Sequence, residues 1–226
     1  MIELKERVII MSKKLKAVLF DLDGVLFDTE YISAETVCSR AEAVGIHLDF
    51  NEVLLTAGIA HDKARVMFDE MLKDIGGFEE FRKRTAHFPK HEMPFKDIKI
   101  PYVDELLQAV KAAGLKTAVC SSSTPDYIRK ALSEGKIEKY IDYQISGYQL
   151  PVGKPDPAIY LKAAAELDIK PEEAVVVEDS SYGIESGKRA GCFVIAYHDP
   201  KFNYDQSKAD MSVDDYRDLI EFIKHQ

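Results

Sequence analysis

The chain has 226 residues, of which 46% are hydrophobic, and this composition suits a packed α/β domain with room for a small insert. Its 39 acidic and 30 basic side chains give a formal net charge of -9, so the surface as a whole repels the backbone of DNA or RNA. We therefore expect no nucleic-acid partner, whereas a bound metal cation is compatible with this charge.

Short apolar segments predict the strands of a buried parallel sheet, because they are apolar throughout and lack the alternation of a half-exposed strand. In chain order they are Lys16–Asp21, Leu115–Cys120, Tyr143–Ser146, Glu173–Val177 and Cys192–Ala196. Helical patterns separate them, at Tyr102–Ala113, Pro125–Leu132, Pro157–Leu167 and Ser186–Ala190. Strands that alternate with helices predict an α/β fold with a doubly wound, Rossmann-like parallel sheet and helices on both faces.

The segment 31–91 breaks this alternation, since it shows helical periodicity and no strand-like run. One set of its apolar residues recurs at helical spacing: Ala34, Val37, Ala41 and Val44. We therefore predict a small all-α cap domain of residues 31–91, inserted after the first strand into a core of residues 1–30 and 92–226. The alternative is that these helices pack directly on the sheet.

Polar side chains follow three of the predicted strands, at the carboxyl ends where ligands bind in an open parallel sheet. Asp21 and Asp23 follow the first strand, Ser121 follows the second, and Glu178 and Asp179 follow the run that begins at residue 173. Because the carboxyl ends of parallel strands lie at one edge of the sheet, we expect these side chains to form one cluster.

The chemistry of this cluster points to phosphoryl transfer. Asp21, Asp179 and a backbone carbonyl near Asp23 offer the oxygen ligands that Mg²⁺ prefers, with room left for water and a substrate phosphate. Lys154 adds a positive charge that can hold the phosphate, and the Ser121 hydroxyl can donate to its oxygens. Asp21 is placed to form an aspartyl-phosphate, and Asp23 to protonate the leaving alcohol and then deprotonate the attacking water.

Four parts of the chain also resemble, in order, the motifs of the haloacid dehalogenase-like superfamily, in its phosphatase and phosphomutase branch. They are Asp21–Glu30 (DLDGVLFDTE), Ser121, Gly153–Pro157 (GKPDP), and Val177–Ser180 (VEDS) followed by Gly183-Ile184. Any one of these is a weak signal, but four in order at predicted strand ends and loops are a strong one. The position of segment 31–91 matches the helical cap of that family.

The resemblance implies a magnesium-dependent phosphatase acting on a small phosphorylated metabolite such as a sugar phosphate. It implies that Asp21 is the nucleophile and that Asp23 is the general acid and base. The implied phosphate-binding residues are Ser121, Ser122 and Lys154, and the implied metal ligands are Asp21, Asp23, Asp179 and Glu178. An acid at Asp23 favours phosphoryl transfer over dehalogenation, because the dehalogenases of the superfamily lack it. The segment Thr56–Asp62 resembles the specificity loop of the cap, where Gly58 and His61 are candidate substrate contacts.

A sugar phosphate mutase of the β-phosphoglucomutase type is the alternative function. Such enzymes carry a histidine in the first helix of the cap and an arginine in the specificity loop. Ser33 and His61 stand at the matching positions here, and both differences count against the mutase. A signalling receiver domain has its acid pair and phosphoacceptor in the reverse order, and a dinucleotide-binding module needs a GxGxxG after the first strand. A catalytically inactive binding protein of this family would have lost Asp21 or Asp23.

The cysteine content and the apolar runs of the sequence indicate the cellular compartment in which we expect the protein. Cys38, Cys120 and Cys192 are widely spaced and form no CxxC, which argues against a disulfide framework or a zinc ribbon and favours a reducing compartment. No apolar run approaches the roughly 20 residues of a membrane span, and residues 1–14 lack the features of a signal peptide. We expect a cytoplasmic protein without a membrane partner, and a monomer whose cap can open and close.

Overall fold

The computed structural model describes residues 15–57, 61–88, 93–202 and 204–225, and the chain divides into two compact units. One unit, here called the core unit, comprises Met1–Phe27 and Phe95–Gln226, and the other, here called the helical unit, comprises Asp28–Pro94. The helical unit is slightly longer at both ends than the insert predicted for residues 31–91.

Within the described residues, the core unit contains a six-stranded sheet in the order β3-β2-β1-β4-β5-β6, and every neighbouring pair of strands is parallel. The strands are β1 (Ala17–Phe20), β2 (Lys116–Ser121), β3 (Tyr143–Ser146), β4 (Ala174–Glu178), β5 (Phe193–Tyr197) and β6 (Met211–Val213). This confirms the predicted α/β class. Successive strands are added outward from β1 on one side as far as β3, and the chain then continues on the other side with β4. The order therefore reverses next to β1, where open α/β sheets bind ligands.

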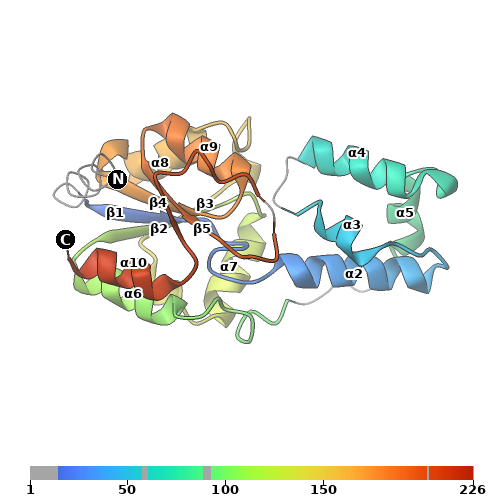
Figure 1. The fold of residues 1–226 in the computed structure, drawn as a ribbon, viewed down its shortest axis with the longest axis horizontal. Helices are drawn as coiled ribbons and strands as arrows, with labels where there is room; N and C mark the ends of the chain where they lie inside the picture. The colour runs from blue at the N-terminus through green and yellow to red at the C-terminus, as the bar shows by residue number, and fades with distance from the viewer. Residues whose placement is uncertain (1–14, 58–60, 89–92, 203, 226) are drawn as a thin grey trace. The chain divides into compact units, whose positions relative to one another are not determined.

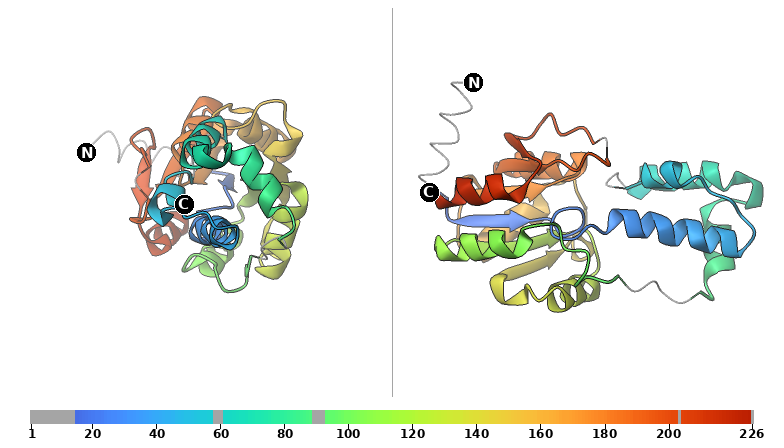
Figure 2. Two further views of the ribbon diagram at one scale, coloured as in Figure 1. Left: turned by 90° about the vertical axis from the view of Figure 1, so that its right-hand side faces the viewer. Right: turned by 60° about the horizontal axis from the view of Figure 1, so that its bottom comes forward.

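Helices cover both faces of the sheet (Figure 1). Helices α6 (Val103–Ala112) and α10 (Tyr216–Lys224) pack together on one face, and α8 (Ala158–Glu166) and α9 (Ser181–Ala190) on the other. Helix α7 (Pro125–Glu134) contacts β3, and Figure 2 shows the same helices and strands from two further directions. Short 3-10 turns complete the unit: η2 (Glu138–Tyr140), η3 (Gly147–Gln149) and η4 (Pro171–Glu173).

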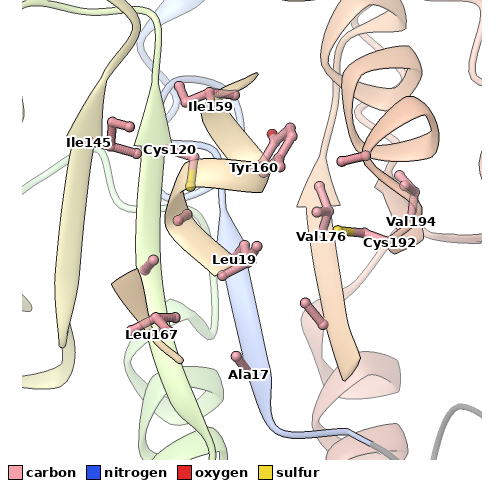
Figure 3. Close-up of a cluster of buried hydrophobic side chains, with 14 of the residues drawn as sticks. Ala17, Leu19, Cys120, Ile145, Ile159, Tyr160, Leu167, Val176, Cys192 and Val194 are labelled. Carbon is pink, nitrogen blue, oxygen red and sulfur yellow. The ribbon is translucent and has the colours of Figure 1, made fainter. Parts of the chain in front are cut away.

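A buried apolar cluster joins the central strands to α8 and α9 (Figure 3). Leu19 of β1, Cys120 of β2 and Val176 of β4 face Ile159 and Tyr160 of α8. All the side chains of β1 and β4 are buried, because helices cover both faces of these strands. This is the physical reason why their sequences are apolar throughout rather than alternating.

Two elements and one helix start were not predicted from the sequence. Strand β6 is too short for its sequence to show a pattern, and α10 begins beyond the last helix that was predicted. Helix α9 begins at Ser181 rather than at Ser186, so the predicted start was wrong. Its first turns contain small residues that pack closely on the sheet, and these weaken the apolar pattern that marks a helix.

The described residues of the helical unit form helices and no strand, as predicted. The helices are α2 (Glu30–Ala43), α3 (Phe50–Leu54), α4 (His61–Met71) and α5 (Phe78–Thr85), with the 3-10 turn η1 (Lys73–Ile75). Their apolar side chains gather in a cluster within the unit: Ala34, Ala41, Leu48, Val53, Phe68, Leu72 and Phe81. Of the apolar set predicted from helical spacing, Ala34 and Ala41 are buried inside the unit itself, and Val37 and Val44 pack against the same cluster. No helix in the described ranges has the length and apolar character needed to cross a bilayer.

Tyr216 connects the C-terminal helix to the loop that follows β1. The side chain is 1% exposed, and its hydroxyl donates to the backbone carbonyl oxygen of Val25 at 2.6 Å. Val25 is two residues from Asp23, so this bond fixes the backbone of the loop that carries the predicted acid.

We predict that Tyr216→Phe lowers the free energy of unfolding by about 1–3 kcal/mol, because it leaves the carbonyl of Val25 buried without this donor. Urea unfolding of both proteins measures the difference. Tyr148→Phe is the matched control, since Tyr148 is 74% exposed and its variant should unfold like the wild type. Equal midpoints for Tyr216→Phe and Tyr148→Phe would contradict the prediction.

Candidate active site

The sheet brings the predicted strand-end residues together at one edge. Asp21 directly follows β1, and its backbone N–H donates to the Val177 carbonyl at 3.0 Å, which continues the pairing of β1 with β4. Asp21 is buried, with 8% of the residue exposed. Ser121 ends β2 and Glu178 ends β4, the two strands that flank β1.

Lys154 lies at the centre of this cluster, although it comes from a loop between β3 and α8. Its ammonium nitrogen is 2.5 Å from Asp21 Oδ1, 2.6 Å from Glu178 Oε1 and 2.9 Å from the Cys120 carbonyl oxygen. The side chain is only 7% exposed. A lysine at this depth needs charged partners, because an unpaired ammonium is costly to bury.

Glu178 is fully buried, and protein donors surround both of its carboxylate oxygens. Besides Lys154, the hydroxyl of Tyr160 donates to Oε1 at 2.8 Å. On Oε2 the backbone N–H groups of Asp179 and Ser180 donate at 3.1 and 3.3 Å, and the Ser180 hydroxyl donates at 3.1 Å. These contacts favour a role in fixing Lys154 and the loop after β4 rather than direct metal ligation.

The charges of the cluster shift one another's pKa. Burial raises the pKa of Asp21 to about 7, although the Lys154 ammonium acts in the opposite direction. Burial by itself lowers the pKa of Lys154, but the carboxylates of Asp21 and Glu178 outweigh it and hold that pKa above its ordinary value. A further cation beside Asp21 would favour its ionised form, as opposite charges do at short distance.

The oxygen donors present fit a magnesium ion. The carboxylate of Asp179 reaches the loop after Asp23, since a Cβ atom built at Gly24 would lie 2.2 Å from Asp179 Oδ2. Across the described ranges, no group of three or more His, Cys, Asp or Glu residues forms a complete metal cage. Mg²⁺ does not need one, because one or two carboxylates with water and a substrate phosphate suffice. Asp21 and Asp179 are therefore suitable protein ligands.

Asp23 has partners that the sequence did not reveal. The Ser123 hydroxyl donates to its Oδ2 at 2.8 Å, and the Tyr127 hydroxyl donates to its Oδ1 at 3.2 Å. The predicted Ser121 lies further away, with its hydroxyl 3.5 Å from Oδ2, and Ser122 is exposed in the same loop. The run of serines after β2 was a usable signal for Ser123, whereas nothing in the sequence marks Tyr127.

Two predicted substrate contacts belong to the helical unit. Gly58 lies outside the described residues, and so does the side chain of His61, the first residue of α4. Their roles therefore stay predictions. Ser33, at the position where a mutase of the resembled family would have a histidine, lies on α2 and donates its hydroxyl to the Thr29 carbonyl at 2.9 Å.

We predict that Gly183→Ala disrupts the cluster, because a Cβ atom at this position would lie 1.7 Å from Glu178 Oε1. Displacing the carboxylate separates it from Lys154, so we expect a loss of at least about 3 kcal/mol in the free energy of unfolding. Gly153→Ala is the matched control, since no atom lies within 4 Å of a Cβ built there. Chemical unfolding of the two variants tests this, and similar stabilities would count against it.

Comparisons with known proteins identify the family of this chain. The family profile of haloacid dehalogenase-like hydrolases matches residues 15–191. A phosphorylated carbohydrates phosphatase of Thermotoga maritima is 34% identical over 78% of this chain and 82% of its own, and a phosphoglycolate phosphatase of Aquifex aeolicus is 31% identical over the same shares. A T. maritima crystal structure, provisionally named a β-phosphoglucomutase, superposes with a TM-score of 0.72 at 29% identity, covering 93% of this chain and 97% of that one. The chain thus belongs to the haloacid dehalogenase-like hydrolases.

Proposed function

We propose that this enzyme is a magnesium-dependent phosphatase that hydrolyses a small phosphorylated metabolite through an aspartyl-phosphate on Asp21. The observation that carries the proposal is the contact of Asp21 with Lys154 at 2.5 Å, at the carboxyl edge of the sheet and next to Asp23. The site thus combines a buried candidate nucleophile and a second acid from the loop after β1 with a fixed positive charge from the loop between β3 and α8.

In the first half of the reaction, a carboxylate oxygen of Asp21 attacks phosphorus and the ester P–O bond breaks. The leaving alkoxide takes a proton from Asp23 and departs as an alcohol. In the second half, a water attacks the phosphorus of the aspartyl-phosphate and gives a proton back to Asp23. The bond between phosphorus and Asp21 breaks, which releases inorganic phosphate and restores both carboxyl groups.

The other residues of the cluster position the phosphoryl group and offset charge. Lys154 keeps the Asp21 carboxylate in place and offers its positive charge to the phosphoryl oxygens, and Ser121 and Ser122 donate hydrogen bonds to them. A bound Mg²⁺, held by Asp21, Asp179 and the backbone carbonyl of Asp23, would supply further positive charge at the phosphate. Glu178 does not contact the phosphoryl group in this proposal; it acts by holding the Lys154 ammonium in place.

Sugar phosphates are the substrate class that we propose first, because the T. maritima relative is named for phosphorylated carbohydrates. We assign selection of the leaving group to the helical unit, which we propose to be the cap of this enzyme, with Gly58 and His61 in its specificity loop. A monomeric, cytoplasmic enzyme remains our expectation.

We predict that Asp21→Asn lowers the rate of phosphate release by more than about 1,000-fold, because an amide cannot form the phosphoenzyme. The assay is phosphate release from a panel of sugar phosphates, with Mg²⁺ and again with a chelator, and we expect activity only with Mg²⁺. Asp218→Asn is the control, since Asp218 is exposed on α10. Undiminished turnover by Asp21→Asn would refute the mechanism.

The mutase is kept as a second candidate because of the structural likeness to the T. maritima protein. We predict that β-glucose 1-phosphate is converted to glucose and inorganic phosphate. Ser33 cannot provide the imidazole that the mutases carry there, and its hydroxyl is bonded to the α2 backbone. Analysis of the products by NMR distinguishes the two reactions, and accumulation of glucose 6-phosphate without phosphate release would assign the enzyme as a mutase.

A further inference from the structure

The segment that joins β2 to α7 supplies hydroxyl groups to Asp23. Ser123 Oγ lies 2.8 Å from Asp23 Oδ2, and Tyr127 OH lies 3.2 Å from Oδ1, so each carboxylate oxygen has a hydroxyl partner. Both partners are about a hundred residues away in the sequence and belong to the same unit as Asp23. The contacts therefore arise from the packing of the core unit.

The two hydroxyl groups are themselves held in place. The backbone of Ser123 makes two hydrogen bonds. Its carbonyl accepts from the Ser146 hydroxyl at 2.6 Å, and the N–H of Ser123 donates to Ser121 Oγ at 3.0 Å. Tyr127 lies in the first turn of α7, and its ring meets the ring of Phe95 edge-on at 5.2 Å. Because the donors are anchored, they restrict the side-chain rotation of Asp23 rather than follow it.

The kind of partner matters for a group that must hold and release a proton. A hydroxyl can donate to a carboxylate and can also accept from a carboxylic acid, whereas an ammonium or a backbone N–H can only donate. Asp21 is paired with the Lys154 ammonium, which stabilises an anion and suits a nucleophile. Ser123 and Tyr127 instead hold the two carboxylate oxygens of Asp23 through neutral hydroxyl groups.

We infer that Ser123 and Tyr127 are positioning residues for Asp23, holding its carboxyl group at the leaving oxygen during phosphoryl transfer. This inference rests on the proposed phosphatase function, in which Asp23 gives its proton to the departing alkoxide. Loss of a positioning contact lets the carboxyl group rotate away from the leaving oxygen, and misplacement of a reacting group slows a reaction strongly.

The test compares two leaving groups in single-turnover reactions with the enzyme in excess and Mg²⁺ present. Phenyl phosphate has a poor leaving group that needs the proton of Asp23, and p-nitrophenyl phosphate has a good one that needs it far less. We expect Tyr127→Phe and Ser123→Ala each to slow phenol release about tenfold, as lost acid catalysis does, while release of p-nitrophenol changes by less than about twofold. Ser123→Thr, which keeps the hydroxyl, should restore the phenyl phosphate rate.

The controls separate this inference from the proposed function and from a change in folding. Tyr148→Phe, at an exposed position of the core unit, should leave both rates unchanged. Equal slowing of both substrates, or no rescue by Ser123→Thr, would mean a structural role and would overturn the inference. If the wild type releases neither phenol with Mg²⁺, or if Asp21→Asn stays active, it is the proposed function that fails.

Discussion

The pairing of the Lys154 ammonium with two buried carboxylates is the interaction on which the rest of the site depends. Asp21 follows β1 and Glu178 ends the neighbouring β4, so the parallel sheet brings two buried acids close together. The Lys154 ammonium lies 2.5 and 2.6 Å from these carboxylates and offsets their negative charges. Lys154 makes a third contact, in which its ammonium donates to the Cys120 carbonyl of β2. One side chain thus links the ends of three strands and offsets the negative charge of the proposed nucleophile.

The packing of α9 depends on the carboxylate of Glu178. Glu178 fills the space beside Gly183 and accepts hydrogen bonds from the N–H and hydroxyl groups of Ser180, the N-cap of α9. The loop that carries Asp179 is held from the other side as well, because the amide of Gln206 donates to the carbonyls of Asp179 and Tyr197 at 2.6 and 2.8 Å. The stability of the core and the placement of the proposed metal ligand therefore depend on one connected set of contacts.

The sequence predicted those features that follow from the burial of strands. Strands β1 and β4 are apolar because both faces are covered, and the acids that end them had to meet at one edge once the sheet was parallel. Ser121 could be assigned to this edge because it follows a predicted strand, and Lys154 because its charge complements the acids, and both assignments agree with the family motifs. The sequence could not predict three further contacts, those of Tyr160, Tyr127 and Gln206. Their partners lie 18, 104 and 27 residues away, and no local sequence pattern indicates such contacts. The predicted helix was shorter than α9 for a related reason. The small residues in the first turns of α9 are required by its contacts with the neighbouring strand and with Glu178, and the sequence pattern does not show these contacts.

The loop after β1 places two identical acids, only two residues apart, in different environments, as their two proposed roles require. Asp21 continues the strand direction into the buried charges of Lys154 and Glu178, whereas Asp23 turns toward the hydroxyls of the β2–α7 segment. Gly24 allows this turn, with φ +75° and no room for a Cβ atom beside Asp179. A side chain at this position would push the loop away from the β4 edge and separate Asp23 from the proposed metal ligand. The different environments of the two acids, rather than their identity, support the proposed assignment of Asp21 to bond formation and of Asp23 to proton transfer.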